Sequence, residues 1–369
     1  MADGICGNFV SKKINKVRWK PHPDRDVSAS DTFITGSWDD SENELALWQF
    51  ATSGDQEGDL VNLTSVPHLG DVTELKFINA ENFVSSSSFG SVKLFRLAKS
   101  GIKSSWSIIE EISWNKLHYF EHASPWENCS CTAFASYDED IVTVGEDGRM
   151  VLLTAHQRNP VRIMNGADSC SLHCVCFLKY NQVITGNLRG QLKVWDFGSP
   201  NSHKPVSTFM FSGDQVTAMC ITQHPTQRHV VLVGGEDGSL TAWDLRHSRY
   251  PVNLLNAHPD AVNEVKFHPM QPEHLFTCSA SGEIWHWNTT AISNAAAGGA
   301  HLGRGGSGTS MPEVDGVGWL GGEASKHRLE VFSLIPALHK PINSLDIDRD
   351  SLVCGCDNEA IYLLSNITL

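Results

Sequence analysis

The chain has 369 residues, of which 41% are apolar and 19% are charged, a composition that can bury a large core. Its 42 Asp and Glu exceed its 28 Lys and Arg, so the formal net charge is −14. This charge argues against a general affinity for nucleic acid or anionic membranes, because both attract proteins with a positive field. The sequence has no run of 18 apolar residues and no secretory signal at its start, so neither membrane insertion nor secretion is expected.

The ten cysteines are too sparse for a disulfide scaffold. Three pairs are two residues apart, which places both members on one face of a strand. These pairs are Cys129 and Cys131, Cys174 and Cys176, and Cys354 and Cys356. None has the two-to-four-residue gap of a zinc site, so we expect buried, reduced thiols that pack as small apolar side chains.

One unit recurs along the chain: a turn that contains glycine, followed by an alternating strand that ends in an aromatic residue. In the clearest copy, the turn Glu236-Asp237-Gly238 precedes a strand that ends at Trp243-Asp244. The turn glycines of five copies are Gly90, Gly148, Gly190, Gly238 and Gly282. Their spacings of 42 to 58 residues are typical of a four-stranded propeller blade, with insertions between some copies.

Each turn has the chemistry of a β-hairpin, and two further β-rich runs precede it, such as those that begin at residues 72, 172 and 262. Weaker copies at residues 39–48 and 357–363 bring the number of units to seven. This pattern predicts an all-β fold, a closed seven-bladed β-propeller. The last unit lacks one strand, and residues 8–11 are expected to supply it, which closes the ring without an exposed edge.

Two segments interrupt the repeat within this single domain of residues 1–369. Residues 113–127 form an aromatic loop insertion, which follows a predicted strand at residues 105–112. Residues 288–325 are rich in Gly, Ala and Ser and predict a flexible insertion. The letters from Gly303 to Gly308 match a dinucleotide-binding motif, but no strand precedes them and no helix follows.

The sequence indicates no enzyme. Its 17 histidines have no ligand spacing for a metal, and neither a nucleophile elbow nor a phosphate-binding loop is present. We therefore expect no catalytic residues, no cofactor, no metal and no small-molecule substrate.

The Trp-Asp endings and the dipeptide Ala257-His258 resemble WD-repeat propellers over nearly the whole chain. The resemblance implies a buried Asp–His–Ser/Thr–Trp hydrogen-bond chain in some blades. Blade six retains His258, Ser279 and Trp287 of it, whereas Ser281 replaces the turn aspartate.

Longer strings resemble a narrower family, that of the smallest WD-repeat nucleoporin of the Y-shaped outer-ring complex of the nuclear pore. They include Thr35-Gly36-Ser37-Trp38-Asp39-Asp40-Ser41-Glu42-Asn43 and residues 142–149, 190–197, 272–279 and 352–357. The resemblance implies a non-enzymatic scaffold subunit in the nucleus, at the nuclear pore complex. Such a subunit supports pore assembly, mRNA transport and protein transport, and attaches to kinetochores in mitosis. The implied partners are other outer-ring nucleoporins, in particular the helical subunit of the short arm, with no direct contact to nucleic acid.

No motif transfers partner-binding residues, so candidates come from residue type and place. Trp38 follows a predicted strand and precedes an acidic run, and Trp126 lies in the aromatic insertion after Pro125. Exposed aromatic residues are frequent anchors of protein interfaces. Arg246 is the third candidate, because Trp243-Asp244-Leu245-Arg246 matches the Trp-Asp-x-Arg element of WD-repeat substrate receptors of cullin–RING ubiquitin ligases. That receptor role is the alternative function.

Overall fold

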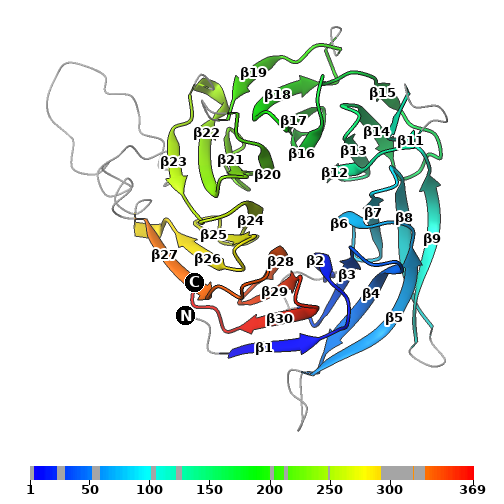
Figure 1. Ribbon diagram of the computed structural model, residues 1–369, viewed down its shortest axis with the longest axis vertical. Helices are drawn as coiled ribbons and strands as arrows, with labels where there is room; N and C mark the ends of the chain where they lie inside the picture. Colours follow the sequence, from blue (N-terminus) through cyan, green and yellow to red (C-terminus); the bar gives the residue numbers. More distant parts are fainter. Residues whose placement is uncertain are drawn as a thin grey trace, which may run out of the picture.

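The protein is a ring of seven four-stranded antiparallel sheets (Figure 1). Their innermost strands line a central channel. The computed structural model describes residues 4–22, 30–51, 59–100, 105–121, 127–199, 203–211, 215–247, 250–291, 319 and 329–369. Helical structure is minor in these residues and includes the 3-10 turn η1 (Leu245–His247). The predicted all-β, seven-bladed propeller is therefore confirmed.

In blades one to six, four consecutive strands run from the channel to the rim. Blade one consists of β2 (Ile14–Trp19), β3 (Thr32–Ser37), β4 (Asn43–Phe50) and β5 (Leu60–His68). Blade two consists of β6 (Val72–Phe77), β7 (Asn82–Ser87), β8 (Val92–Lys99) and β9 (Trp106–Trp114). Blade three consists of β12 (Cys131–Tyr137), β13 (Asp140–Gly145), β14 (Met150–Thr154) and β15 (Arg162–Met164). Blade four consists of β16 (Leu172–Lys179), β17 (Gln182–Asn187), β18 (Gln191–Asp196) and β19 (Ser207–Met210). Blade five consists of β20 (Ala218–Gln223), β21 (Val230–Gly235), β22 (Ser239–Asp244) and β23 (Asn253–Asn256). Blade six consists of β24 (Val262–Phe267), β25 (His274–Ser279), β26 (Ile284–Asn288) and β27 (Glu330–Ile335).

Blade seven joins the two ends of the described chain. Its strands are β28 (Ile342–Asp348), β29 (Ser351–Cys356), β30 (Ala360–Ser365) and, at the rim, β1 (Gly4–Phe9). The pairing of β1 with β30 confirms the predicted closure, but the strand is Gly4–Phe9 rather than residues 8–11. Ser11 has a φ of +58°, a left-handed conformation that ends extended pairing before it.

The two insertions differ from the repeat in distinct ways. β9 continues through Trp114, and a short hairpin pairs β10 (Tyr119–Phe120) with β11 (Glu127–Asn128). Within residues 292–328 the structure describes Trp319 alone, which is 2% exposed and lies with its ring 6.1 Å from that of Phe267. The predicted flexibility of 288–325 falls mostly outside the described residues and stays a prediction.

Hydrophobic clusters fill the seven spaces between neighbouring sheets, one cluster for each junction. At the junction of blades one and two, Leu47 and Ile34 pack with Leu75 and Phe83. The cluster at the junction of blades seven and one combines Val353 and Ile361 with residues of blade one, such as Val17. Because each sheet buries both faces in this way, the core is a closed ring rather than a central ball.

Buried hydrogen bonds between side chains tie strands together within some blades. In blade six the hydroxyl that contacts His258 Nε2 (2.7 Å) and Trp287 Nε1 (3.0 Å) belongs to Thr277, not to Ser279 as the sequence suggested. Ser279 lies two residues further along β25 and contacts Ser281 instead. The prediction of Ser279 as the hydroxyl partner of His258 and Trp287 was therefore wrong by two residues, which is one step along the same face of the strand.

A second set of hydrogen bonds joins each blade to the next around the channel. Every innermost strand has a register shift near its start that is consistent with a β-bulge, at the same position in all seven blades. At each bulge, or one residue after it, a side chain donates to the carbonyl of the first residue of the next innermost strand. The seven bonds are Asn15 to Val72, Thr73 to Cys131, Thr132 to Leu172, Cys174 to Ala218, Cys220 to Val262, Asn263 to Ile342, and Asn343 to Ile14.

These seven bonds, here called the inter-blade ring, are not equal in strength. Asparagine or threonine donates at five junctions, with N–O distances of 2.6 Å for Asn15 and 2.9 Å for Asn263. At the two junctions that flank blade five the donors are the thiols of Cys174 and Cys220, each 3.3 Å from its acceptor. Thiols are weak donors, so blade five is held least firmly by this ring.

Arg18 of β2 connects blades that are not neighbours. Its Nη2 lies 2.6 Å from Glu74 Oε1 in blade two and 2.7 Å from Glu264 Oε1 in blade six, and its Nη1 donates to Ser344 Oγ in blade seven. Burial alone would raise the pKa of Glu264, but the combined effect of Arg18, the two nearby lysines Lys16 and Lys266, and the hydrogen bond from Ser344 lowers this pKa to about 2. Burial acts likewise on Glu74, whose pKa Lys16 and Arg18 hold below its usual value.

The inter-blade ring predicts a difference between two adjacent junctions. Asn263→Ala leaves the Ile342 carbonyl without its donor and should lower the free energy of unfolding by about 1–3 kcal/mol. Cys220→Ala removes a weak thiol bond and should cost about 1 kcal/mol or less. Urea unfolding of both variants measures the difference, and equal losses would contradict the ranking of the junctions.

The Arg18 cluster predicts both a stability loss and a pH dependence. Arg18→Ala removes the nearest ion-pair partner of Glu74 and of Glu264 and should lower the free energy of unfolding by about 3–5 kcal/mol. The control Arg96→Ala breaks an exposed pair with Glu111 and should cost about 1 kcal/mol or less. In the native protein, Glu264 contributes to the free energy of unfolding in full above its unfolded pKa of 4.5. This contribution is lost as the pH falls towards about 2, the pKa of Glu264 in the folded state.

Acid titration of unfolding separates this explanation from simple loss of packing. In Arg18→Ala burial of Glu264 is no longer opposed by the guanidinium, so acid unfolding should begin at a higher pH than in the native chain or in Arg96→Ala. An unchanged acid midpoint in Arg18→Ala would show that the cluster does not control the titration of Glu264.

Candidate protein-interaction surfaces

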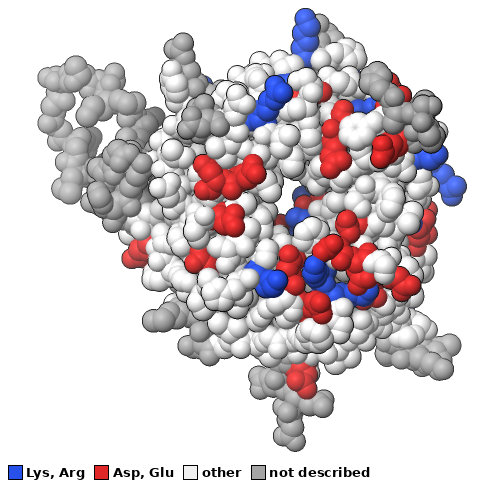
Figure 2. All heavy atoms as spheres, in the orientation of Figure 1, with Lys and Arg blue, Asp and Glu red and all other residues white. Residues whose placement is uncertain are grey.

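The central channel is a cavity of about 760 Å³ lined by the innermost strands of all seven blades, and its opening lies at the centre of Figure 2. Its charged groups compensate one another: Lys16 lies 3.6 Å from Glu74, and Lys266 lies 3.3 Å from Asp346. Burial raises the pKa of the Cys220 thiol to about 12, so this channel residue is protonated at neutral pH and is a poor nucleophile. The channel therefore provides mainly structural charge pairs.

Trp38 lies at the channel, in the turn between β3 and β4 of blade one. Its Nε1 donates to Asp357 Oδ1 in blade seven at 2.9 Å, and the same oxygen accepts a bond from Asn343 at 2.6 Å. The indole is partly exposed, so it offers a ring surface while its N–H joins the last blade to the first. The structure thus gives Trp38 a contact across a blade junction that the sequence did not predict.

The other two predicted anchors do not join Trp38. Trp126 lies outside the described residues. Arg246 lies in η1 beyond the far end of β22, on the opposite face of the ring from the Trp38 turn. Its guanidinium is 2.7 Å from Asp244 of the same Trp-Asp-x-Arg element, and this hydrogen bond lowers the pKa of Asp244. The arginine of that element is therefore bonded to the element's own aspartate.

Two exposed apolar side chains that the sequence analysis did not single out lie on the Trp38 face of blade two. Leu69 is 68% exposed in the loop between β5 and β6, and Phe89 is 48% exposed in the turn between β7 and β8. The Ser87 hydroxyl donates to the Leu69 carbonyl at 2.5 Å, which holds the loop against the turn. The signal in the sequence is Phe89 itself, an aromatic residue directly before a turn glycine.

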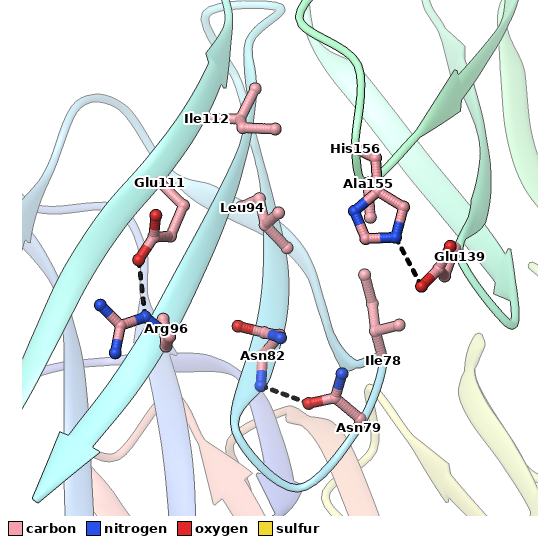
Figure 3. Close-up of a pocket in the computed structure, with 10 residues that line it drawn as sticks. All are labelled: Ile78, Asn79, Asn82, Leu94, Arg96, Glu111, Ile112, Glu139, Ala155 and His156. Carbon is pink, nitrogen blue, oxygen red and sulfur yellow. Dashed lines mark hydrogen bonds and ion pairs between the residues drawn. The ribbon is translucent and has the colours of Figure 1, made fainter.

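A groove of about 400 Å³ runs between blades two and three (Figure 3). Ile78, Leu94 and Ile112 supply its apolar lining. Polar contacts lie at its two sides: Arg96 Nε forms an ion pair with Glu111 at 2.6 Å, and His156 Nε2 lies 2.6 Å from Glu139 Oε1. A register shift in β9 leaves Glu111 opposite no residue of β8. The groove has room for one or two side chains of a partner.

Within the described ranges, no group of three or more His, Cys, Asp or Glu is placed to hold a metal ion. No helix in that part of the chain is long and apolar enough to cross a bilayer. All ten cysteines fall in the described part, and none of them is in a disulfide there.

Comparison with known proteins identifies the relatives of the chain. The family WD40 (WD domain, G-beta repeat) matches residues 249–288, which include blade-six strands β24, β25 and β26. Nucleoporin Nup43 of Mus musculus is 39% identical over 97% of this chain and 98% of its own length. Nucleoporin Nup43 of Homo sapiens is 38% identical over 98% of this chain and 99% of its own length.

A more distant relative matches over a shorter region. Nuclear pore complex protein nup43 of Dictyostelium discoideum is 32% identical over 42% of this chain and 36% of its own length. The mouse and human similarities instead extend across all seven blades and both insertions. The chain therefore belongs to the Nup43 family of nucleoporins.

Proposed function

We propose that this protein is a non-enzymatic scaffold subunit of the Y-shaped outer ring of the nuclear pore complex. The observation that carries the proposal is the similarity to mouse and human Nup43, which covers 97–98% of the chain and so includes the whole propeller. A rigid ring whose loops face solvent suits a subunit that acts by holding partners in place.

The charged groups of the channel support a structural role. Arg18 forms ion pairs with Glu74 at 2.6 Å and with Glu264 at 2.7 Å, so these charges hold blades together. The similarities to known proteins give no support to the alternative of a ubiquitin-ligase receptor, and the Arg246 side chain bonds to Asp244.

The finer parts of the proposal concern partners and place. The partners are other outer-ring nucleoporins, in particular the helical subunit of the short arm. The protein lies at the nuclear pore in interphase, where it supports pore assembly, mRNA transport and protein transport, and at kinetochores in mitosis. Its net charge of −14 favours protein partners over direct contact with nucleic acid.

Affinity purification of the tagged full chain from its own cells tests this function. We expect outer-ring nucleoporins in near-stoichiometric amounts, a tagged signal at the nuclear rim, and a kinetochore signal in mitosis. Recovery of a cullin and its adaptor propeller without nucleoporins would overturn the scaffold proposal. Nucleoporins and a rim signal without the kinetochore signal would overturn only the mitotic part.

Trp38 is the anchor to test first. Trp38→Ala removes the exposed ring and should reduce nucleoporin binding by about thirtyfold, equivalent to about 2 kcal/mol. Trp38→Phe keeps a ring but loses the 2.9 Å bond to Asp357, so binding should stay near that of the native chain while unfolding costs about 1 kcal/mol less. Quantitative co-purification and thermal melting measure the two effects. Native-like binding by Trp38→Ala would place the docking surface elsewhere.

A further inference from the structure

The blade-two turn departs from its counterparts in the other blades. Before the turn glycine, blades three to six carry Asp147, Arg189, Asp237 and Ser281, all polar, whereas blade two carries Phe89. Asp147 and Asp237 each accept a bond from the backbone N–H two residues on, at 3.0 Å. The Phe89 side chain cannot accept such a bond, and the ring remains 48% exposed. Phe89 therefore does not stabilise its turn by the hydrogen bond that aspartate makes in blades three and five.

Phe89 and Leu69 form one apolar patch, which we call the blade-two patch. Gly70 has a φ of +75°, and a Cβ built on it would lie 2.3 Å from Cδ2 of Phe89. The ring thus lies directly over Gly70, next to Leu69, in a position that a larger residue at 70 would block. Ser88 and Asp71 exchange two further bonds, at 2.8 and 3.0 Å, which fix the two loops together. The patch is preformed rather than assembled by a partner.

Acidic loops flank the patch on both sides. Asp71 accepts bonds from the Asp39 N–H and the Asn43 side chain, which links the patch to the acidic turn of blade one. On the other side, the Gly90 carbonyl accepts bonds from Leu117 and His118, at the base of the hairpin that carries Glu127. Figure 2 shows acidic side chains gathered over the strands of blades one and two beside the channel.

The charge around the blade-two patch is negative after internal pairing. The described loops of blades one to three on this face hold eight carboxylates and four bases: Asp39, Asp40, Glu42, Asp71, Glu121, Glu127, Glu146 and Asp147, against Lys12, Lys13, Lys116 and Arg149. Lys12 and Lys13 pair with Asp40 and Asp39, and Arg149 pairs with Glu121 and Asp147. Within the described residues, Glu42, Asp71, Glu127 and Glu146 have no base as ion-pair partner.

We propose that the blade-two patch is a docking site for a segment of a partner nucleoporin that presents apolar side chains flanked by lysine or arginine. This inference rests on the proposed scaffold function and specifies one surface for it. The apolar pair supplies burial, and the carboxylates around it select a basic segment and steer its approach. An acidic or uncharged segment would gain the same burial but would meet repulsion or no attraction.

Paired variants of the full chain test the surface. Leu69→Ser with Phe89→Ser should reduce nucleoporin recovery at least tenfold. The matched control, Tyr180→Ser with Met270→Ser, changes two residues that are 67% and 60% exposed in turns of the opposite face, and should bind like the native chain. Glu127→Lys with Glu146→Lys should also weaken binding at least tenfold, because it reverses the selecting charge. Melting temperatures near the native value show that all three variants fold.

A photo-crosslinking amino acid identifies what lies on the patch. Placed at position 89 in the purified native complex, it should attach to a nucleoporin segment with net positive charge, far more often than the same amino acid at position 180. Attachment to acidic or neutral segments, attachment to a second copy of this chain, or equal yields at the two positions would each overturn the proposal.

The outcomes also separate this inference from the scaffold function. If the native chain recovers nucleoporins and the Leu69/Phe89 variant recovers them equally well, the docking surface is wrong and the scaffold function stands. If the native chain recovers no nucleoporins, the function itself fails. Salt provides an internal check, because binding that depends on the carboxylates should weaken between 0.15 and 0.5 M ionic strength as screening increases.

Discussion

The hydrogen bond from one blade to the first carbonyl of the next innermost strand is the constraint on which the rest of the ring depends. Hydrophobic clusters between sheets are tolerant of sliding, because apolar contact has little direction. A bond from Asn15 to Val72, or from Asn343 to Ile14, permits one register only. Repeated at all seven junctions, it fixes the height and rotation of every blade about the channel, and so the position of every loop that a partner could contact.

Arg18 adds a connection of another kind. In an open repeat array each unit touches only its neighbours, and stability is close to a sum of local terms. The guanidinium of Arg18 instead contacts blades two, six and seven from blade one. Loss of any one of these blades exposes charge in the others, which favours unfolding of the ring as one unit. The weaker thiol bonds around blade five are the exception, and local opening is easiest there.

Repeat length and turn chemistry were sufficient to predict the seven blades and the closure of the last one. They did not reveal the bulge in each innermost strand, because it lies next to the first residue of the strand, where too few positions precede it to establish the alternation that it shifts. The same alternation made Ser279 and Thr277 equivalent on one face of β25, and the sequence chose the wrong hydroxyl. Trp319 was hidden for a different reason: a glycine-rich and alanine-rich average says nothing about one buried indole within the segment.

The interaction surfaces were harder to predict than the fold, because exposure depends on how loops fold over one another. Trp38 looked like a free anchor in the sequence, yet its N–H is bound across a blade junction. Phe89 looked like part of a regular repeat, yet its ring lies on Gly70 and faces solvent.

The pairing of β1 with β30 has a consequence for synthesis: Gly4 leaves the ribosome more than 350 residues before its partner Ser365. At about 5–20 residues per second, β1 waits tens of seconds as an unpaired strand, while six blades fold ahead of it. The growing chain therefore has two open strand edges until Ser365 has been synthesised, and keeping them apart from other chains is a task for chaperones rather than for the fold.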